Sequence, residues 1–262
     1  MNRLILGQYI PGESLIHRLD PRTKLISSIW FILLIFLASN FWSYALLAGI
    51  VLLAAYISEI PLSYYINGLK PLTFLILITV SLQLLFSQGE TIVLNLGWFQ
   101  ITLEGIINAI KIIVRFVLII FMSTILTLTT TPLEIADGIE SLLKPLKKVK
   151  VPVEEIALVL SIALRFVPTL IEETEKIMNA QRSRGVEFNV GSLVERMKKI
   201  VPLLIPLFIS SIDRADQLAT AMTARGYQGG DHRTKLRELN WENRDYSIFI
   251  LFILLTVLLI II

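Results

Sequence analysis

The feature that most constrains this chain is a long apolar stretch, residues 25–58, that contains no charged side chain. A helix that crosses a bilayer needs about 20 residues, so the stretch can form one long tilted helix or two short ones. Residues 38–44 read Ala-Ser-Asn-Phe-Trp-Ser-Tyr, a polar and aromatic sequence typical of a membrane interface. We therefore predict two short helices joined by a tight hairpin at residues 38–44.

Three further apolar segments are predicted to span a membrane: residues 71–86, 106–128 and 247–262. Residues 62–70 are expected to form a short loop or an interfacial piece, and residues 87–104 a polar connection. Only 17% of the residues are charged, whereas a soluble domain has about 25%. The sequence thus predicts an all-α integral membrane protein with about five transmembrane helices.

The segment from residue 133 to residue 245 has a different character, because it holds 17 of the 24 Lys and Arg residues and 16 of the 21 Asp and Glu residues. Its apolar residues still recur with a helical period. We predict a short amphipathic helix near residues 135–146, a long helix from Pro152 to Gly185, and a third helix that begins at Ser192. This part is expected to be a coupling region of long amphipathic helices.

Capping signals and prolines predict where these helices start, bend and stop. Ser192, with Glu195 one helical turn later, has the pattern of a capping box. Pro168 is expected to kink the long helix, and Pro202 and Pro206 are expected to break the third helix.

The placement of basic residues predicts the orientation, because Lys and Arg are enriched in cytoplasmic segments. Residues 1–24 and the coupling region are basic, whereas residues 87–104 contain no Lys or Arg. We predict four parts: a cytoplasmic N-terminal segment (1–24), four transmembrane helices (25–131), cytoplasmic coupling helices (132–245) and a final transmembrane helix (246–262). Asp20 followed by Pro21 suits the start of the first helix.

Two short sequences, Ser183-Arg184-Gly185 and Ala224-Arg225-Gly226, end two similar helical patterns that match position by position at a fixed offset. A glycine after the last helical residue and an arginine in the last turn are ordinary features of a helix end. That explanation suits one occurrence better than two at a fixed offset. An exposed Arg can form a bidentate bond with a carboxylate of another protein, so we interpret the two sequences as docking ends for two similar partner subunits.

Other residues allow more than one interpretation. Residues 201–212 are almost entirely apolar, so they must contact lipid, another protein or the spans of the same chain. Lys111 and Arg115 lie one turn apart within a predicted span; they are expected to reach the membrane interface or to form an ion pair, for which Glu104 is a candidate.

The sequence lacks residues that several classes of function require. The chain has no cysteine and only two histidines, His17 and His232, too few for a metal cluster of Cys and His. It also lacks the Gly-x-x-x-x-Gly-Lys-Ser/Thr loop of nucleotide-binding proteins. We therefore expect no enzymatic activity, no cofactor, no resident metal and no nucleic acid partner, so that any active transport must draw its energy from another protein.

The sequence resembles the transmembrane T component of energy-coupling factor (ECF) transporters, the family that includes the membrane subunit of cobalt and nickel systems. The resemblance covers essentially the whole chain. It rests on the stretch from Ser14 through His17 to Lys24, on the two Arg-Gly ends, and on the order of spans, coupling region and final span. Ser183 departs from the alanine that is usual there, and serine is equally small.

The resemblance implies a non-catalytic subunit in the cytoplasmic membrane. Two ABC ATPase subunits, identical or different, would each receive one Arg-Gly end, and a separate S component would bind the vitamin or metal ion. Arg184 and Arg225 would make the main ATPase contacts, and Ser183, Gly185, Ala224 and Gly226 would shape the ends. Candidate contacts for the S component share an apolar character: Leu160, Leu164, Val167, Leu203, Leu204, Leu207 and Phe208. Lipid is the remaining expected partner.

Two alternatives remain open from the sequence. A conventional permease would bind its substrate between its own helices, and would need polar groups facing a central cavity. A membrane-bound enzyme would need clustered carboxylates or histidines in the coupling region, where the sequence offers only scattered ones.

Overall fold

The computed structural model describes residues 9–87, 91–95, 100–229 and 239–261. They divide into two compact units, each of which is described by itself: unit 1 comprises Met1–Gly138 with Leu239–Ile262, and unit 2 comprises Ile139–Glu238. The predicted charged segment that includes His232 lies partly outside the described residues, as does part of the polar connection at residues 87–104.

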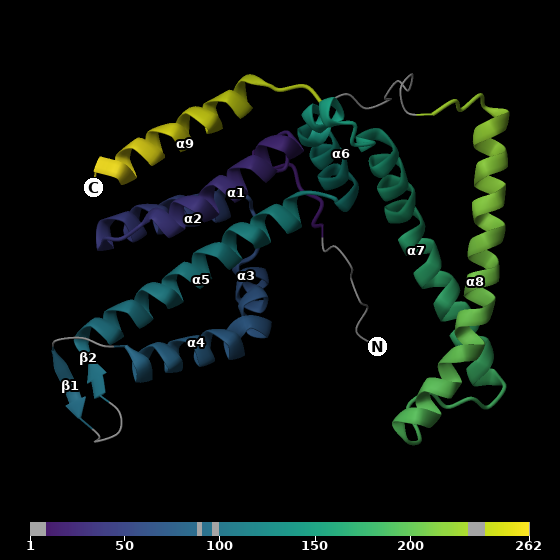
Figure 1. Cartoon of the computed structure of the whole chain (residues 1–262), viewed down its shortest axis with the longest axis horizontal. Coiled ribbons are helices and arrows are strands. Elements are labelled where there is room, and N and C mark those ends of the chain that lie inside the picture. The colour runs from purple at the N-terminus through teal and green to yellow at the C-terminus, as the bar shows by residue number, and fades with distance from the viewer. Residues whose placement is uncertain (1–8, 88–90, 96–99, 230–238, 262) are drawn as a thin grey trace. The chain divides into compact units, whose positions relative to one another are not determined.

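Unit 1 is a bundle of apolar helices around α5 (Leu103–Thr129), which contacts most of the others (Figure 1). The other elements of the bundle, in chain order, are α1 (Pro21–Leu37), α2 (Phe41–Ile57), α3 (Leu62–Leu69), the 3-10 helix η1 (Lys70–Leu72), α4 (Thr73–Phe86), strands β1 (Ile92–Asn95) and β2 (Gln100–Thr102), and α9 (Asn243–Ile261). Helix α6 (Pro132–Leu143) follows α5, and the 3-10 helix η2 (Lys144–Val149) follows α6.

The all-α membrane fold class is confirmed, and within the described residues three helical segments are long and apolar enough to cross a membrane: Leu62–Phe86, Leu103–Thr129 and Asn243–Ile261. The predicted hairpin also forms, because α1 ends at Leu37 and α2 begins at Phe41. These two helices have 17 residues each, slightly fewer than the length of about 20 residues that a span needs.

Both predicted connections contain regular structure. Residues 62–70, expected to be a short loop or an interfacial piece, are not a loop: they are helical and continue through η1 into α4. The amphipathic pattern of Leu62–Leu69 allows Tyr65 to be buried against α5 while its neighbours stay exposed. The polar connection contains a short antiparallel hairpin of β1 and β2, which the sequence analysis did not predict.

The core of unit 1 lies where α1, α2, α5 and α9 meet. Phe31, Ile35, Leu47 and Val51 have 1% exposure or less, and side chains of α5 and α9 pack against them. The outer faces of the same helices are apolar and exposed. In a bilayer, an apolar side chain is as favourably placed against lipid as against another helix. Close van der Waals packing, rather than exclusion of water, therefore holds such a core together.

The N-terminal segment is attached to the end of α5. The Ile10 amide donates to the Leu128 carbonyl at 2.9 Å, and the His17 Nε2 lies 3.0 Å from the Ile10 carbonyl oxygen. Because a carbonyl only accepts, Nε2 carries the proton, and Nδ1 faces the Ser14 hydroxyl at 2.6 Å. Burial lowers the pKa of the His17 imidazole, which agrees with a neutral ring held between these groups.

The start of α1 is capped as the sequence predicts. The Asp20 carboxylate accepts from the Arg22 amide at 2.8 Å, with Pro21 in the first helical position. Asp20 also pairs with the Arg22 guanidinium at 2.9 Å. The Asp20 amide donates to Asp245 at the start of α9, so that the first and last helices of the chain are joined at one end.

Arg115, within α5, is held differently from the ion pair with Glu104 that the sequence suggested. Its guanidinium donates to the Tyr44 hydroxyl at 2.9 Å and lies 5.0 Å from the centre of the Phe36 ring. Glu104 instead accepts from the Thr91 hydroxyl at 2.8 Å. The pairing with Glu104 is therefore wrong: aromatic and hydroxyl groups of α1 and α2 hold the cation.

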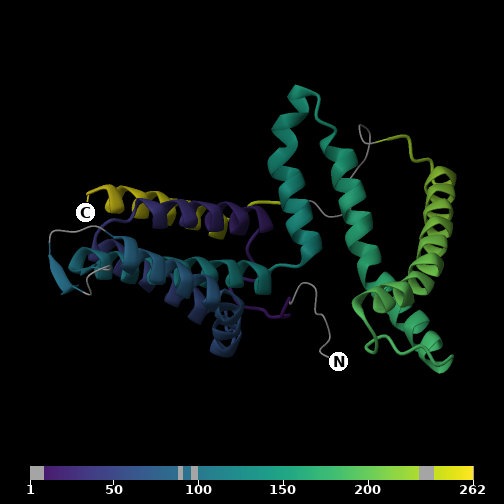
Figure 2. The same cartoon turned by 60° about the horizontal axis from the view of Figure 1, so that its bottom comes forward.

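Unit 2 consists mainly of two long helices, α7 (Val153–Ser183) and α8 (Leu193–Ala224). The capping box at Ser192 is confirmed, since Ser192 and Glu195 each bond the other's backbone. The predicted break at Pro202 and Pro206 is wrong: α8 is one helix of 32 residues with both prolines inside it. Figures 1 and 2 show α8 bending instead, as expected where prolines remove hydrogen bonds but flanking turns persist.

Candidate functional site

The two predicted docking ends have the same backbone structure. At the end of α7 the Gly185 amide donates to the Arg182 carbonyl at 2.9 Å, and the Val186 amide donates to Gln181 at 3.1 Å. At the end of α8 the corresponding bonds, from Gly226 to Thr223 and from Tyr227 to Met222, are both 3.0 Å. Both ends are therefore Schellman motifs.

The arginines occupy the same conformation at the two ends. Arg184 has φ −87° and ψ 9°, and Arg225 has φ −87° and ψ 7°. The glycines that follow have positive φ angles, +84° for Gly185 and +77° for Gly226. The two repeated sequences thus have the same local backbone structure. The side chain of each Arg therefore starts from the same backbone geometry at the end of its helix.

Both glycines are required by their backbone angles rather than by close packing. A Cβ atom added to Gly185 or Gly226 would meet nothing within 4 Å, but the residue would have to adopt the left-handed region. An L-residue there costs about 1–2 kcal/mol. The space beside each glycine is open, which leaves room for the backbone of another protein.

Replacing either glycine by alanine should loosen its helix end. We expect Gly185→Ala and Gly226→Ala each to cost about 1 kcal/mol, which corresponds to about fivefold faster exchange of the Val186 or Tyr227 amide hydrogens. Hydrogen exchange followed by mass spectrometry measures this. The control is Gly49→Ala, because Gly49 is helical and faces open space; unchanged exchange at the altered ends would contradict the conformational requirement.

The side chains of both ends are exposed. Ser183, Arg184, Gly185, Ala224, Arg225 and Gly226 all lie at the surface of unit 2. Within the described residues, no hydrogen bond or ion pair is formed by the guanidinium of Arg184 or Arg225, whereas the Ser183 hydroxyl bonds the Asn179 carbonyl of its own helix. Both cations are therefore available to carboxylates of another molecule.

Helices α7 and α8 are joined by an ion pair that sequence reasoning did not find. The Arg214 guanidinium donates to Glu173 Oε2 at 2.9 Å, and the Ser210 hydroxyl donates to Glu173 Oε1 at 2.6 Å. The Ser210 hydrogen bond and the Arg214 charge lower the pKa of the Glu173 carboxyl. Glu173 and Arg214 hold equivalent positions in the two repeats, 41 residues apart. Equivalence in an alignment does not predict a contact, so only the crossing of α7 and α8 brings these two charges together.

The ion pair lies equally far along the chain from the two Arg-Gly ends. We call the part of each helix between the ion pair and its Arg-Gly end an arm. The arm of α7 runs from position 173 to position 185, and the arm of α8 runs from position 214 to position 226. From the helical rise per residue, each helix end lies about 18 Å from the ion pair. The two helices run in opposing directions from it (Figure 1), so the ends are well separated, by at most about 36 Å, and each can contact a different subunit or a different copy.

The predicted S-component residues fall into three groups. Leu204, Leu207 and Phe208 line one apolar groove of about 580 Å³, together with Leu170 and Thr174 of α7. Leu204 and Phe208 are exposed, Leu207 is half-buried and Leu203 is buried. On α7, Leu160 is exposed, and Leu164 and Val167 are half-buried; these three do not line the groove.

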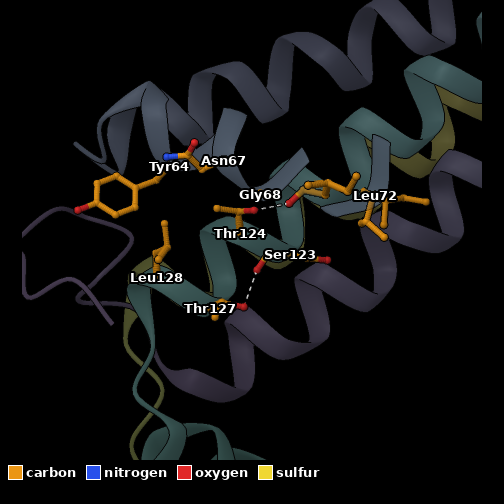
Figure 3. A pocket seen from close by; sticks show the side chains of 10 residues that line it. Tyr64, Asn67, Gly68, Leu72, Ser123, Thr124, Thr127 and Leu128 are labelled. Carbon is orange, nitrogen blue, oxygen red and sulfur yellow. Dashed lines mark hydrogen bonds between the residues drawn. The ribbon is translucent and has the colours of Figure 1, made fainter. Parts of the chain in front are cut away.

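A second groove, of about 690 Å³, lies in unit 1 between α3 and α5 (Figure 3). Tyr64, Asn67 and Gly68 face the α5 residues Ser123, Thr124 and Thr127 across it. Two of the hydroxyls already bond carbonyls of their own helix: Thr124 bonds Ile120 at 2.7 Å, and Thr127 bonds Ser123 at 2.9 Å. The groove is polar in part, but none of the described residues that line it is charged.

Metal-binding clusters are absent from the part of the chain that the structure describes: it holds no group of three or more His, Cys, Asp or Glu that could bind an ion. The best-defined chemical feature is therefore the pair of exposed Arg-Gly ends.

Comparison with known proteins identifies the family. The family model described as CbiQ, cobalt transport protein, matches residues 12–236. The chain is 57% identical over 246 residues to the energy-coupling factor transporter transmembrane protein EcfT of Lacticaseibacillus paracasei, covering 94% of this chain and 93% of that protein. The chain belongs to the ECF transporter transmembrane-protein family.

Other members are similarly close. The EcfT of Lactococcus lactis is 53% identical over 260 residues, covering 99% of this chain and 98% of that protein. The EcfT of Bacillus subtilis is 50% identical over 259 residues, with the same coverage of both chains. The family resemblance seen in the sequence is confirmed, and the chain is a membrane component of a transporter.

Proposed function

We propose that the chain is the non-catalytic coupling subunit of an ECF-type importer. In this role it transmits movement from two ABC ATPase subunits to an S component that binds a micronutrient, either a vitamin or a metal ion. Unit 2 and the N-terminus lie on the cytoplasmic side in this proposal, in agreement with the distribution of Lys and Arg.

One observation carries the proposal: the exposed Arg184 and Arg225 occupy matching Schellman ends. Two similar ATPase subunits would present similar acceptor surfaces, and matching ends are what two such surfaces require. A bidentate Arg–carboxylate pair is roughly twice as strong as a neutral hydrogen bond. The open space at Gly185 and Gly226 lets an ATPase backbone come close to each end.

The crossing of α7 and α8 gives a route by which the ends can move together. Glu173, Ser210 and Arg214 join the helices between the two arms. If the ATPase subunits approach each other, the arms are drawn together about this contact. The apolar groove lined by Leu204, Leu207 and Phe208 lies beside the same crossing, so movement of the arms changes the shape of a surface offered to the S component.

The conventional permease is the weaker candidate. The groove of Figure 3 supplies hydroxyls and an amide, but Thr124 and Thr127 donate to their own helix. Because no described lining residue carries a charge, the groove offers little to a metal ion or a charged vitamin.

Affinity purification of the full chain from native membranes tests the proposal. We expect two ATPase subunits for each chain, together with a small apolar membrane protein that binds the substrate. The purified chain alone should bind no vitamin or metal ion in isothermal titration. Substrate binding by the chain without partners would favour the permease and would contradict the coupling role.

A further inference from the structure

The turn between α6 and α7 exposes lysines and large apolar side chains together. All eight residues from 143 to 150 are exposed. They include four lysines and no acidic residue. Leu143, Leu146 and Val149 are 39%, 42% and 77% exposed. Water solvates the lysines well but not these three side chains, so the turn favours surroundings that accept both kinds of group.

The conformation of η2 sorts these residues onto different edges. A 3-10 helix has three residues per turn, so side chains three positions apart lie one above the other. Leu146 and Val149 therefore share one edge, and Lys144 and Lys147 share a second. The Lys150 amide closes the turn by donating to the Lys147 carbonyl at 3.0 Å. Helix η2 is thus a short amphipathic helix with an apolar edge beside a cationic one.

The positive charge of this turn is only partly compensated. Lys147 pairs with Glu154, at the start of α7, at 3.0 Å. Within the described residues, the ammonium groups of Lys144, Lys148 and Lys150 form no hydrogen bond or ion pair. Three exposed cations are therefore available to anions of the surroundings.

Chain connectivity keeps η2 near the surface of the bilayer. Helix α9 has 19 residues, about 28 Å, which matches a hydrocarbon thickness of about 30 Å, so α9 begins near one surface. The bond from the Asp20 amide to Asp245 places the start of α1 there too. Helix α6 packs against that start, because a Cβ atom added to Gly138 would lie 2.9 Å from Leu25 Cδ1. Only about 9 Å of helix separates Gly138 from Lys144.

We propose that η2 rests on the bilayer and binds the headgroup layer of anionic phospholipid. Its apolar edge enters the boundary between headgroups and acyl chains, and the three available lysines contact phosphate groups. All four cations are lysines, which bind phosphate as point charges, whereas the two docking ends carry arginine. An acidic protein surface would compensate the lysines but not the apolar edge beside them. The contact anchors the beginning of α7 at the membrane, so that α7 moves about a fixed end.

The test measures how close η2 lies to the headgroups when the full chain alone is reconstituted in lipid vesicles. Because the chain has no cysteine, Val149→Cys carries a single bimane fluorophore. Phosphatidylcholine with a nitroxide on its headgroup is the quencher. We expect strong quenching in vesicles that contain phosphatidylglycerol and weak quenching with phosphatidylcholine alone. Thr220→Cys places the same label at an exposed position on the arm of α8 and should be quenched little in either.

Two pairs of lysine substitutions test the charge. Lys148→Gln with Lys150→Gln should lower the ratio of bound to free η2 by about twentyfold to thirtyfold, since each lysine near an anionic surface contributes about fivefold. Lys176→Gln with Lys198→Gln removes the same charge at other exposed positions of α7 and α8 and should leave the quenching unchanged.

Three outcomes would overturn the proposal that η2 binds anionic phospholipid. They are equal quenching of the two labels, equal quenching with and without phosphatidylglycerol, and equal loss of quenching in the two pairs of lysine variants. Absence of quenching in vesicles that hold no other protein would leave an acidic protein as the partner of the lysines. The comparison of the two lipid compositions uses unaltered lysines, so it does not depend on how the glutamine variants fold.

Discussion

Reversing both exposed arginines, Arg184→Glu with Arg225→Glu, should abolish association with the ATPase subunits while membrane insertion is preserved. Each Arg is exposed and, within the described residues, forms no hydrogen bond or ion pair with its side chain, so the change costs unit 2 little. Loss of one partner from a buried charge pair at an interface costs about 2–5 kcal/mol. Two losses amount to at least about 4 kcal/mol, or roughly a thousandfold in affinity.

The measurement is the ratio of ATPase to chain after affinity purification from membranes. The control is Lys176→Glu with Lys198→Glu, which changes the net charge equally at two other exposed positions of α7 and α8. Each single reversal should reduce the ratio without abolishing it, since one end remains. A normal ratio for the double reversal would show that the ends do not dock the ATPases.

The second large effect should come from Asp245 at the start of α9. The residue is 2% exposed, and its carboxylate accepts from the Asp20 amide at 3.2 Å and from the Glu242 amide at 2.9 Å. Asp245→Ala leaves both amides without this acceptor. Because bonds to charged groups contribute about 1.5–3 kcal/mol each, we expect the free energy of unfolding to fall by about 3 kcal/mol.

Unfolding by a denaturing detergent in mixed micelles, followed by circular dichroism, measures this change. Glu242→Ala is the control: the Glu242 side chain is 65% exposed, and its carboxylate lies 3.9 Å from Arg244. An exposed pair contributes about 0.2–1 kcal/mol. Equal destabilisation by the two substitutions would mean that the buried bonds of Asp245 do not hold the first and last helices together.

Local sequence signals were reliable wherever a few neighbouring residues decide the structure. The cap at Asp20, the capping box at Ser192 and the glycine ends of α7 and α8 are all present. Prolines were less reliable. A helix can continue past Pro202 and Pro206 because it loses only the bonds nearest each ring, and packing of α8 against α7 supports the turns on either side.

Contacts between distant residues could not be derived from the sequence. Glu104 was the candidate partner that the sequence suggested for Arg115, and only the approach of α1 and α2 selects Phe36 and Tyr44 instead. Likewise, Leu203 and Leu204 are neighbours of equal hydrophobicity, yet one is buried and the other exposed. Which side of α8 is covered depends on the path of α7.

The sequence by itself determined the apolar helices, the charged segment at residues 133–245 and the two Arg-Gly ends, because hydrophobic length, helical period and end signals are properties of short segments. The tertiary structure alone decided that the ends extend equally from the ion pair of Glu173 and Arg214. It alone also brought side chains of α1, α2, α5 and α9 together around one apolar cavity. Both features arise where helices distant in sequence meet, and their geometry depends on how whole helices pack.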